Sequence, residues 1–341
     1  MGSVLVTGAF GNVGRSTLAA LSRRGVDAVA FEFPSKANLG TARRDFPGLR
    51  VAWGDVRDRA ALESSLAACP GGADAVIHLA AVIPPAADRN PAFAESVNVG
   101  GTAAVLEAMA ARAPQARLVY TSSIATYGDR LADWLVRPGD PQRPQDDDPY
   151  AVQKTAAEAL VRASALEWVV CRLSYVVWRR KTAMDPLMFR MPLGTRVEVV
   201  HTEDCGEALA EACFAPDAAL RVFDIAGGES CRTFYGEYLD RMLAIFGLGG
   251  RRFLPEKAFA RKGYHCAWVD TSESQQVLRF QRRSLEDYYA EVREEAKGLR
   301  FWAALARPFV RAAIKARSPF LAASRTAARA LRGRRATAGA Y

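Results

Sequence analysis

The sequence is short of the residues that bind metal ions or form disulfides. It has 3 histidines and 6 cysteines among 341 residues, and no two cysteines stand in a Cys-x-x-Cys pair. A metal site needs several such ligands close together, so we expect no bound metal. Scattered cysteines without a pairing pattern are typical of reduced thiols in the cytoplasm.

Long apolar runs are also missing, which argues against a membrane-spanning helix. The first predicted strand starts at Ser3, and this leaves no room for a signal peptide before it. Together the two observations predict a cytoplasmic protein.

Acidic residues are absent from the C-terminal end of the chain. From Lys297 to Tyr341 there are 11 Lys or Arg residues and no Asp or Glu, whereas the first 296 residues carry 35 basic and 37 acidic side chains. The formal net charge of +9 therefore belongs to the tail and gives no information about a site in the body. Although this charge would suit nucleic acid, the chain has no recognised nucleic-acid-binding motif, and we expect no such partner.

The tail, residues 296–341, also has an amphipathic pattern, and Pro308 predicts two short helices in it rather than one. Basic amphipathic helices bind anionic membranes, so the pattern is compatible with peripheral membrane contact; the alternative is a helix packed on the body or on a partner subunit. The first basic stripe consists of Arg300, Arg307, Arg311 and Lys315. The apolar stripe on the opposite side consists of Trp302, Leu305 and Phe309. A second basic stripe further along the chain consists of Arg325, Arg329 and Arg332.

The most informative segment is a glycine-rich turn between an apolar strand and a helical pattern. Gly8 permits a tight turn, Gly11 lets a ligand phosphate approach the backbone, and Gly14 lets the helix pack against the strand. The N-terminus of the helix presents N–H groups and the positive end of its dipole to a pyrophosphate. The turn therefore predicts a dinucleotide-binding loop, and the residues expected at the cofactor are Gly8, Phe10, Gly11, Asn12, Val13 and Gly14.

Strand and helix signals then alternate through the first half of the chain. Apolar strands bounded by helices predict an α/β fold of Rossmann type, with a doubly wound parallel sheet covered on both faces. The predicted strands are Ser3–Thr7, Ala28–Phe33, Arg50–Trp53, Ala75–Leu79, Arg117–Ser122 and Trp168–Leu173, and the predicted helices are Asn12–Arg24, Ala60–Ala68, Pro91–Arg112 and Tyr150–Ala163.

The alternation ends after Val177, which sets the expected domain boundaries. Residues 1–177 form the dinucleotide-binding domain, and its sheet is completed from 197–226 by Val197–Val200 and Arg221–Ile225. Residues 178–196 and 227–295 form a small C-terminal substrate lobe. Its first segment contains Trp178, Met184, Met188, Phe189 and Met191, which either line a site for a hydrophobic substrate or form the core of the lobe.

Tyr150 and Lys154 are four residues apart, so on a helix they share one face. An ammonium beside a phenol favours the phenolate and lowers the tyrosine pKa, which makes the phenol a usable acid or base near neutral pH. Ser122 and Ser123 end the preceding strand, at the sheet edge where ligands bind in such folds. A serine hydroxyl there could hydrogen-bond the same substrate oxygen as the phenol.

Further short segments lie between the glycine-rich turn and Tyr150 and after Lys154. In chain order they are Gly54–Asp58, Ile77–Ala81, Asn98–Thr102, Thr121–Gly128, Val200–Asp204 and Ile225–Gly228. With the glycine triplet and the Tyr150/Lys154 pair, the order and spacing resemble the extended short-chain dehydrogenase/reductases, the NAD-dependent epimerase/dehydratase-like group. The resemblance covers the first 230 positions.

The resemblance implies roles for the matched positions. Tyr150 is the general acid/base, Lys154 lowers its pKa and hydrogen-bonds the nicotinamide ribose, and Ser123 orients the substrate oxygen. Asn98, counted among the cofactor-binding positions, supports the active-site backbone or a water, and the alternative is an asparagine that only packs against a neighbouring helix. The remaining positions implied to contact the cofactor are Asp55, Val56, Leu79, Ala80 and Ala81. A homodimer through the helices that carry Asn98 and Tyr150 is the family's usual assembly.

The choice of cofactor depends on the end of the second strand. Glu32 lies where an acidic side chain hydrogen-bonds both ribose hydroxyls, and its charge repels a 2′-phosphate. The sequence therefore favours NAD over NADP, although Lys36, Arg43 and Arg44 follow closely.

Three functions agree with these residues. The first is an NAD-dependent oxidoreductase acting on a secondary alcohol or ketone, the second an NAD-dependent epimerase of a sugar or sugar-like substrate that retains its cofactor, and the third a non-catalytic NAD-binding protein. The dehydratase branch of the family has an Asp-Glu pair after the serine, where this chain has Ile124 and Ala125, so a sugar 4,6-dehydratase is disfavoured.

Overall fold

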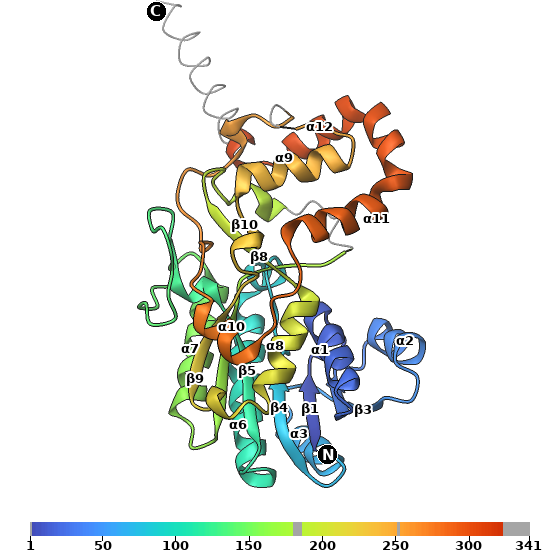
Figure 1. Ribbon diagram of the computed structural model, residues 1–341, viewed down its shortest axis with the longest axis vertical. Helices are drawn as coiled ribbons and strands as arrows, with labels where there is room; N and C mark the ends of the chain where they lie inside the picture. The colour runs from blue at the N-terminus through green and yellow to red at the C-terminus, as the bar shows by residue number, and fades with distance from the viewer. Residues whose placement is uncertain (1, 180–185, 251–252, 323–341) are drawn as a thin grey trace, which may run out of the picture.

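The computed structural model describes residues 2–179, 186–250 and 253–322, and its centre is a parallel sheet (Figure 1). Seven strands lie in the order β3-β2-β1-β4-β5-β6-β9, and every neighbouring pair is parallel. The order reverses between β1 and β4, as in a doubly wound fold, and so confirms the predicted Rossmann-type sheet. The strands are β1 (Ser3–Thr7), β2 (Asp27–Glu32), β3 (Arg50–Trp53), β4 (Ala73–His78), β5 (Arg117–Ser123), β6 (Trp168–Leu173) and β9 (Arg221–Ile225).

Helices cover both faces of this sheet, each on its own apolar cluster. One face carries α1 (Asn12–Arg23), α8 (Thr202–Ala212) and α10 (Ser272–Leu278), and the other carries α3 (Arg59–Ala67), α6 (Gly101–Arg112) and α7 (Pro149–Ala163). The strands are apolar on both sides because both sides are buried.

A second, smaller sheet belongs to the lobe. The strand β8 (Arg196–His201) pairs in parallel with β7 (Tyr175–Val177) and antiparallel with β10 (Arg232–Phe234). The sequence predicted that both Val197–Val200 and Arg221–Ile225 return to the main sheet. The second does, as β9, but the first does not, because its strand pairs with lobe strands instead.

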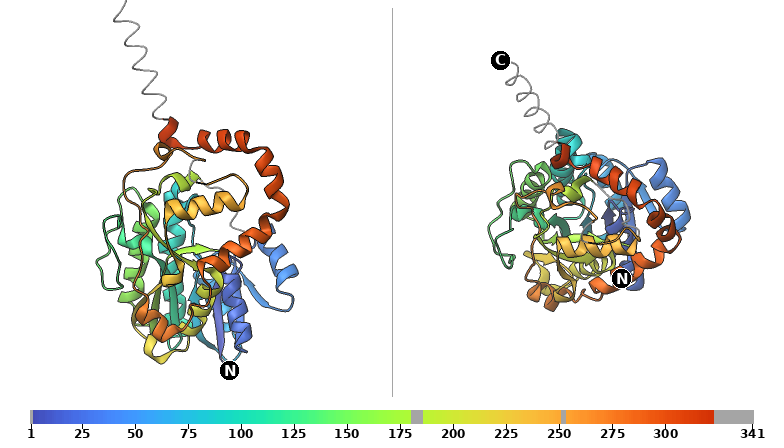
Figure 2. Two further views of the ribbon diagram at one scale, coloured as in Figure 1. Left: turned by 45° about the horizontal axis from the view of Figure 1, so that its top comes forward. Right: turned by 90° about the horizontal axis from the view of Figure 1, so that it is seen from above.

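The lobe lies over the carboxyl ends of the parallel strands (Figures 1 and 2). It contains α9 (Tyr235–Ile245), α11 (Leu285–Leu305) and α12 (Arg307–Ala316), packed around a cluster rich in tyrosine and phenylalanine. The break between α11 and α12 is where Pro308 predicted it. Within the described residues no helix is both long and apolar enough to cross a membrane.

Two stretches differ from the predicted elements. The helix α2 (Lys36–Asp45) was not predicted, and the predicted helix Pro91–Arg112 contains a π-helical turn, η1 (Ser96–Gly100), between α5 (Pro91–Glu95) and α6. Single π-helical turns are frequent at functional sites, and this one carries Asn98. The remaining elements are α4 (Ala86–Arg89), η2 (Ile124–Tyr127), η3 (Pro186–Phe189), η4 (Pro216–Ala218), η5 (Glu229–Cys231) and η6 (Glu256–Ala258).

Candidate active site

The glycine loop joins β1 to α1, and its three glycines have different surroundings. Gly8 has a φ of +65°, and a Cβ there would lie 2.7 Å from the backbone nitrogen of Ala80, just past the end of the neighbouring strand β4. A Cβ on Gly14 would lie 2.5 Å from the Gly8 oxygen. A Cβ on Gly11 would meet only the Gly8 oxygen, at 3.4 Å. Tight packing thus explains Gly8 and Gly14, whereas the space at Gly11 is open.

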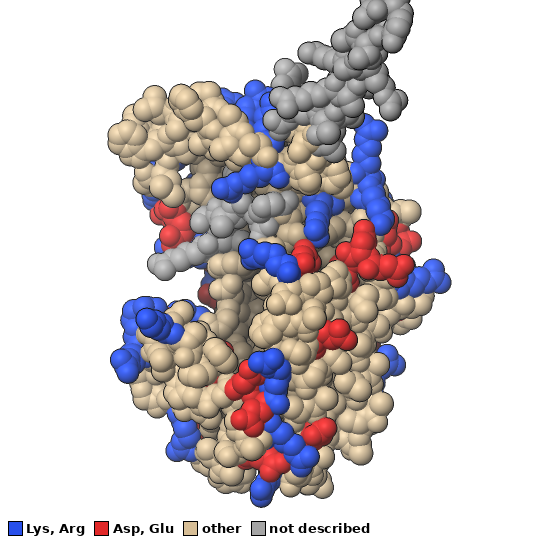
Figure 3. Space-filling view, turned by 180° about the vertical axis from the view of Figure 1, so that it is seen from behind, with Lys and Arg blue, Asp and Glu red and all other residues tan. Residues whose placement is uncertain are grey.

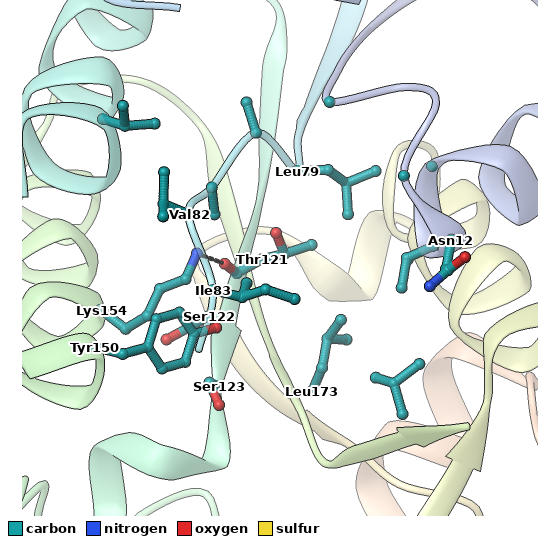
Figure 4. Close-up of a pocket in the computed structure, with 18 of the residues that line it drawn as sticks. Asn12, Leu79, Val82, Ile83, Thr121, Ser122, Ser123, Tyr150, Lys154 and Leu173 are labelled. Atoms are coloured by element: carbon teal, nitrogen blue, oxygen red, sulfur yellow. Dashed lines mark hydrogen bonds between the residues drawn. The ribbon is translucent and has the colours of Figure 1, made fainter. Parts of the chain in front are cut away.

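A cavity of about 820 Å³ begins at this loop and runs along the carboxyl ends of the strands to the lobe. A volume of this size suits a bound small molecule or cofactor. In Figure 4, Asn12 lies on one side of the cavity, and Tyr150 and Lys154 project into it from α7 on the other. The predicted site residues that line it are Gly8, Phe10, Gly11, Asn12, Val13, Gly14, Glu32, Asp55, Val56, Leu79, Ala80, Ala81, Ser123, Tyr150 and Lys154.

Acidic side chains lie at the loop end of the cavity. Glu32 Oε2 accepts a hydrogen bond from the backbone N–H of Phe10 at 3.0 Å, and its Oε1 accepts one from Phe33 at 2.9 Å. The carboxylate is therefore fixed beside the glycine loop, with lone pairs left on both oxygens. Hydrogen bonds from Arg57 hold the pKa of the Asp55 carboxyl below its usual value.

Tyr150 lies near the end of β5, beside the two serines (Figure 4). Burial raises the pKa of the Tyr150 phenol, while a hydrogen bond with the Ser123 side chain acts in the opposite direction. Ser123 Oγ also accepts a hydrogen bond from the N–H of Ala125 at 3.1 Å, which fixes its position at the start of η2. Ser122 Oγ is buried without a hydrogen-bond partner.

Lys154 reaches the same strand end from one turn further along α7. Its Nζ donates a hydrogen bond to the backbone oxygen of Thr121 at 2.8 Å, and burial lowers its pKa to about 8. The sequence predicted a lowered pKa for Tyr150. That prediction is wrong, because the burial of the phenol dominates and raises its pKa.

Asn98 lies behind the wall of the cavity and does not line it. Its side chain accepts a hydrogen bond from the N–H of Val82 at 2.8 Å and donates one to the Val82 carbonyl at 3.0 Å. Gln153 accepts a further bond from Asn98 at 2.8 Å and donates one to the carbonyl of Pro91. The contacts agree with support of the active-site backbone rather than with direct contact to the cofactor.

A histidine from the lobe, absent from the predicted site, lines the cavity near Tyr150. His265 Nδ1 lies 2.7 Å from Oδ2 of Asp148, whose other oxygen accepts a hydrogen bond from Ala151 and so caps α7. Burial acts to raise the pKa of Asp148, but the contact with His265 outweighs burial and leaves that pKa below its usual value. The Asp148-Pro149 pair is a helix-start signal that could have identified the cap, but no local pattern marks His265.

The apolar residues of the first lobe segment divide between the two predicted roles. Phe189 and Met191 are buried in the lobe cluster, and Met188 packs against it. Trp178 lines the cavity. Met184 and the tail residues Arg325, Arg329 and Arg332 lie outside the described residues. Within the part of the chain that the structure describes, no group of His, Cys, Asp and Glu side chains could hold a metal ion.

The sequence model of the NAD dependent epimerase/dehydratase family matches residues 4–191. The chain is 31% identical over 165 residues to the D-erythronate dehydrogenase of Cupriavidus necator, a stretch that covers 47% of this chain and 49% of that protein. It is 35% identical over 133 residues to UDP-glucuronate 4-epimerase 3 of Arabidopsis thaliana, covering 37% of this chain and 30% of that protein. The match thus spans half or less of these curated relatives.

Solved structures match over a larger part of the chain. The structure of MoeE5 in complex with UDP-glucose and NAD superposes with a TM-score of 0.69 and 26% identity, covering 86% of this chain and 98% of that one. The UDP-glucose 4-epimerase of Thermotoga maritima, with UDP-glucose, gives a TM-score of 0.70 at 18% identity, over 89% of this chain and 99% of that one, and shares the fold.

Proposed function

Because the chain belongs to the NAD-dependent epimerase/dehydratase family, we propose that it is an NAD-dependent oxidoreductase acting on a secondary alcohol or the corresponding ketone. One observation carries the proposal. Ser123, Tyr150 and Lys154 line one end of the cavity that begins at the glycine loop. A single ligand can therefore contact the loop and reach the phenol.

The residues at the loop end fit NAD. The open space at Gly11 and the start of α1, which has no side-chain cap, suit a pyrophosphate. Glu32 is held where it can accept hydrogen bonds from ribose hydroxyls, and its charge disfavours the extra phosphate of NADP. Arg44, a candidate partner for that phosphate, is paired with Asp45 instead.

When bound, NAD supplies the hydride acceptor and its reduced form the hydride donor. The Tyr150 phenol exchanges a proton with the substrate oxygen, and Ser123 holds that oxygen in place. The raised pKa keeps the phenol protonated, the form that donates to a ketone oxygen. Lys154 is held by Thr121 within one turn of Tyr150, where its positive charge favours the phenolate needed for the reverse direction.

An epimerase that retains its cofactor is the second candidate. One of the two curated relatives favours it, since it is a UDP-glucuronate 4-epimerase, and MoeE5 was crystallised with UDP-glucose and NAD. The same three side chains would serve, because epimerisation at a carbinol carbon begins with the same oxidation. Net production of NADH distinguishes the oxidoreductase from an enzyme that returns the hydride to its product. A non-catalytic NAD-binding protein would bind NAD but turn over no substrate.

We also propose a homodimer through the helices that carry Asn98 and Tyr150. Three large apolar side chains, Phe93 on α5 and Val152 and Leu160 on α7, are exposed there. Burying them against a second copy would complete the apolar surface of both helices.

Native mass spectrometry of the purified protein tests cofactor and assembly together. We expect a dimer that carries NAD or binds it when it is added. A panel of secondary alcohols and ketones, followed by NADH absorbance, then tests turnover. A protein that shows no affinity for NAD or NADP would contradict the proposal.

The variant Tyr150→Phe tests the role of the phenol. We expect turnover to fall at least about 100-fold, because the proton donor is lost, while NAD affinity stays near that of the wild type. The two serines provide a matched comparison, since the Ser123 side chain acts on the Tyr150 pKa whereas the Ser122 hydroxyl is buried without a hydrogen-bond partner. Ser123→Ala should lose activity and Ser122→Ala should retain it. Unchanged turnover in Tyr150→Phe would rule out the assigned chemistry.

A further inference from the structure

The corner between α11 and α12 exposes an unusual concentration of large apolar side chains. The exposed fractions are 59% for Leu299, 70% for Phe301, 65% for Trp302, 69% for Leu305 and 78% for Phe309. We call these five residues the apolar corner. They fall within 11 consecutive positions, 299–309, and include two of the most exposed aromatic side chains in the described chain.

The exposed side chains are not the ones that hold α11 in place. Its buried residues are Leu285, Tyr288, Tyr289, Val292 and Ala296, which pack into the lobe cluster. Helical spacing places Phe301 and Leu305, four residues apart, on the side of the helix away from that buried stripe. The fold of the lobe therefore does not require apolar side chains at these two positions.

The corner projects from the molecule and has basic side chains beside it. In Figure 2 the end of α11 and the start of α12 form an outer edge of the lobe, and in Figure 3 this edge is a largely uncharged projection at the upper left with basic residues next to it. Lys297, Arg300 and Arg307 are exposed within or next to the corner. No acidic residue occurs from Ala296 to the end of the sequence, which contains 11 basic residues there.

We propose that the apolar corner docks this protein onto an anionic lipid surface. Aromatic and leucine side chains enter the boundary between head groups and acyl chains, and the neighbouring Lys and Arg side chains contact lipid phosphates. The described helices are too short or too polar to cross the bilayer, so the corner lies on its surface.

A second copy of the chain fits this corner less well. A two-fold interface would bring the same basic residues of both copies together, and like charges repel. A projecting edge also needs a matching groove on a protein partner, whereas an acyl layer deforms around it. Charge and shape therefore both favour the lipid surface.

Vesicle co-sedimentation of the full-length protein tests the proposal without any substrate. The probes are vesicles of phosphatidylcholine alone and vesicles of equal parts phosphatidylcholine and phosphatidylglycerol. We expect binding to the anionic vesicles that weakens as salt is raised, little binding to phosphatidylcholine, and a blue shift of tryptophan fluorescence that disappears in Trp302→Phe.

Two variants distinguish binding through the apolar corner from non-specific binding by any exposed apolar side chain. Leu305→Ser should weaken binding to anionic vesicles about tenfold, since the variant loses a leucine side chain that the lipid buries in the wild type. Leu220→Ser is the matched control, because Leu220 is also 59% exposed but lies beside the main sheet, away from the corner. The Leu220→Ser variant should bind the vesicles as the wild type does. Equal melting temperatures will show that both variants fold.

Three results would overturn the proposal. The first is no binding to anionic vesicles at low salt, and the second is wild-type binding by Leu305→Ser, which would mean that charge alone adsorbs the protein. The third is a dimer that Leu305→Ser converts to a monomer, which would assign the corner to a second copy. None of these results depends on the proposed oxidoreductase activity.

Discussion

At the scale of single residues, a buried histidine at the end of β4 couples the stability of the protein to pH. His78 Nδ1 lies 2.7 Å from the Thr7 hydroxyl and Nε2 lies 3.1 Å from the Thr102 hydroxyl. Burial lowers the pKa of His78 to about 3 from its ordinary value of 6.5. The folded state therefore keeps the ring neutral, while the unfolded chain takes up a proton below pH 6.5. This contribution to stability is complete above pH 6.5 and is lost as the pH falls toward 3.

The variant His78→Gln should remove this dependence, because glutamine does not titrate but can still bond both hydroxyls. Between pH 7 and pH 5, the wild type should lose about 2 kcal/mol more of its free energy of unfolding than the variant does. Urea unfolding at the two pH values measures the difference. Parallel losses in the two proteins would mean that His78 is protonated in the folded state.

The site residues show what sequence could and could not predict at this scale. Tyr150, Lys154 and Ser123 were recognised from spacing and resemblance, and the structure brings them together. The direction of the Tyr150 pKa was not predictable, because it depends on burial by segments distant in sequence. His265 was missed for the same reason, since its partner Asp148 lies far from it in the sequence.

At the scale of elements, the glycine loop allows packing and ligand binding to be tested separately. Gly14→Ala places a methyl group against the Gly8 and Ala9 oxygens, so we expect a loss of about 1–3 kcal/mol in the free energy of unfolding. Gly11→Ala meets no such obstacle, and its stability should stay within about 1 kcal/mol of the wild type.

The same pair of variants should behave differently toward NAD. Gly11→Ala should weaken NAD binding in calorimetry, because its methyl group points into the space that we assign to the pyrophosphate. Urea unfolding of both variants provides the stability values. A stable Gly14→Ala protein, or full NAD affinity in Gly11→Ala, would show that the glycines have other roles.

Elements with a strong apolar pattern were predicted from sequence and weakly patterned ones were not. The strand β1 is buried at every position, and its predicted bounds agree with the structure. The helix α2 has no fully buried residue, so no periodic apolar signal marks it. The strand β8 was recognised but assigned to the wrong sheet, because an apolar run does not specify which strands it pairs with.

At the scale of the whole molecule, the lobe and the sheet domain are joined beside the candidate site. The pair of His265 and Asp148 is mostly buried, each side chain being 15% exposed, and it ties the lobe to the helix that carries Tyr150. Lys262 and Asp147 form a second link at 3.1 Å, but both side chains are largely exposed.

His265→Ala should therefore loosen the lobe segment around it. We expect faster amide exchange over residues 259–267 and unchanged exchange in β1 and β4. Lys262→Ala is the control, because an exposed ion pair contributes about 0–1 kcal/mol and its loss should leave exchange nearly unchanged. Equal exchange in wild type and His265→Ala would show that other contacts hold the segment.

The path of the chain between the two sheets restricts how this protein can be recombined with its relatives. After β6 the chain enters the lobe through β7 and β8, returns through α8 and β9, leaves again through β10 and α9, and comes back once more at α10. The returning helix α8 covers α1 so closely that a Cβ on Gly206 would lie 2.5 Å from the backbone of Ser16. A chimera that exchanged the lobe as one continuous segment would therefore also replace α8 and expose the apolar face of α1. Only an exchange of several separate segments would transfer the substrate specificity of the lobe and leave the main sheet intact.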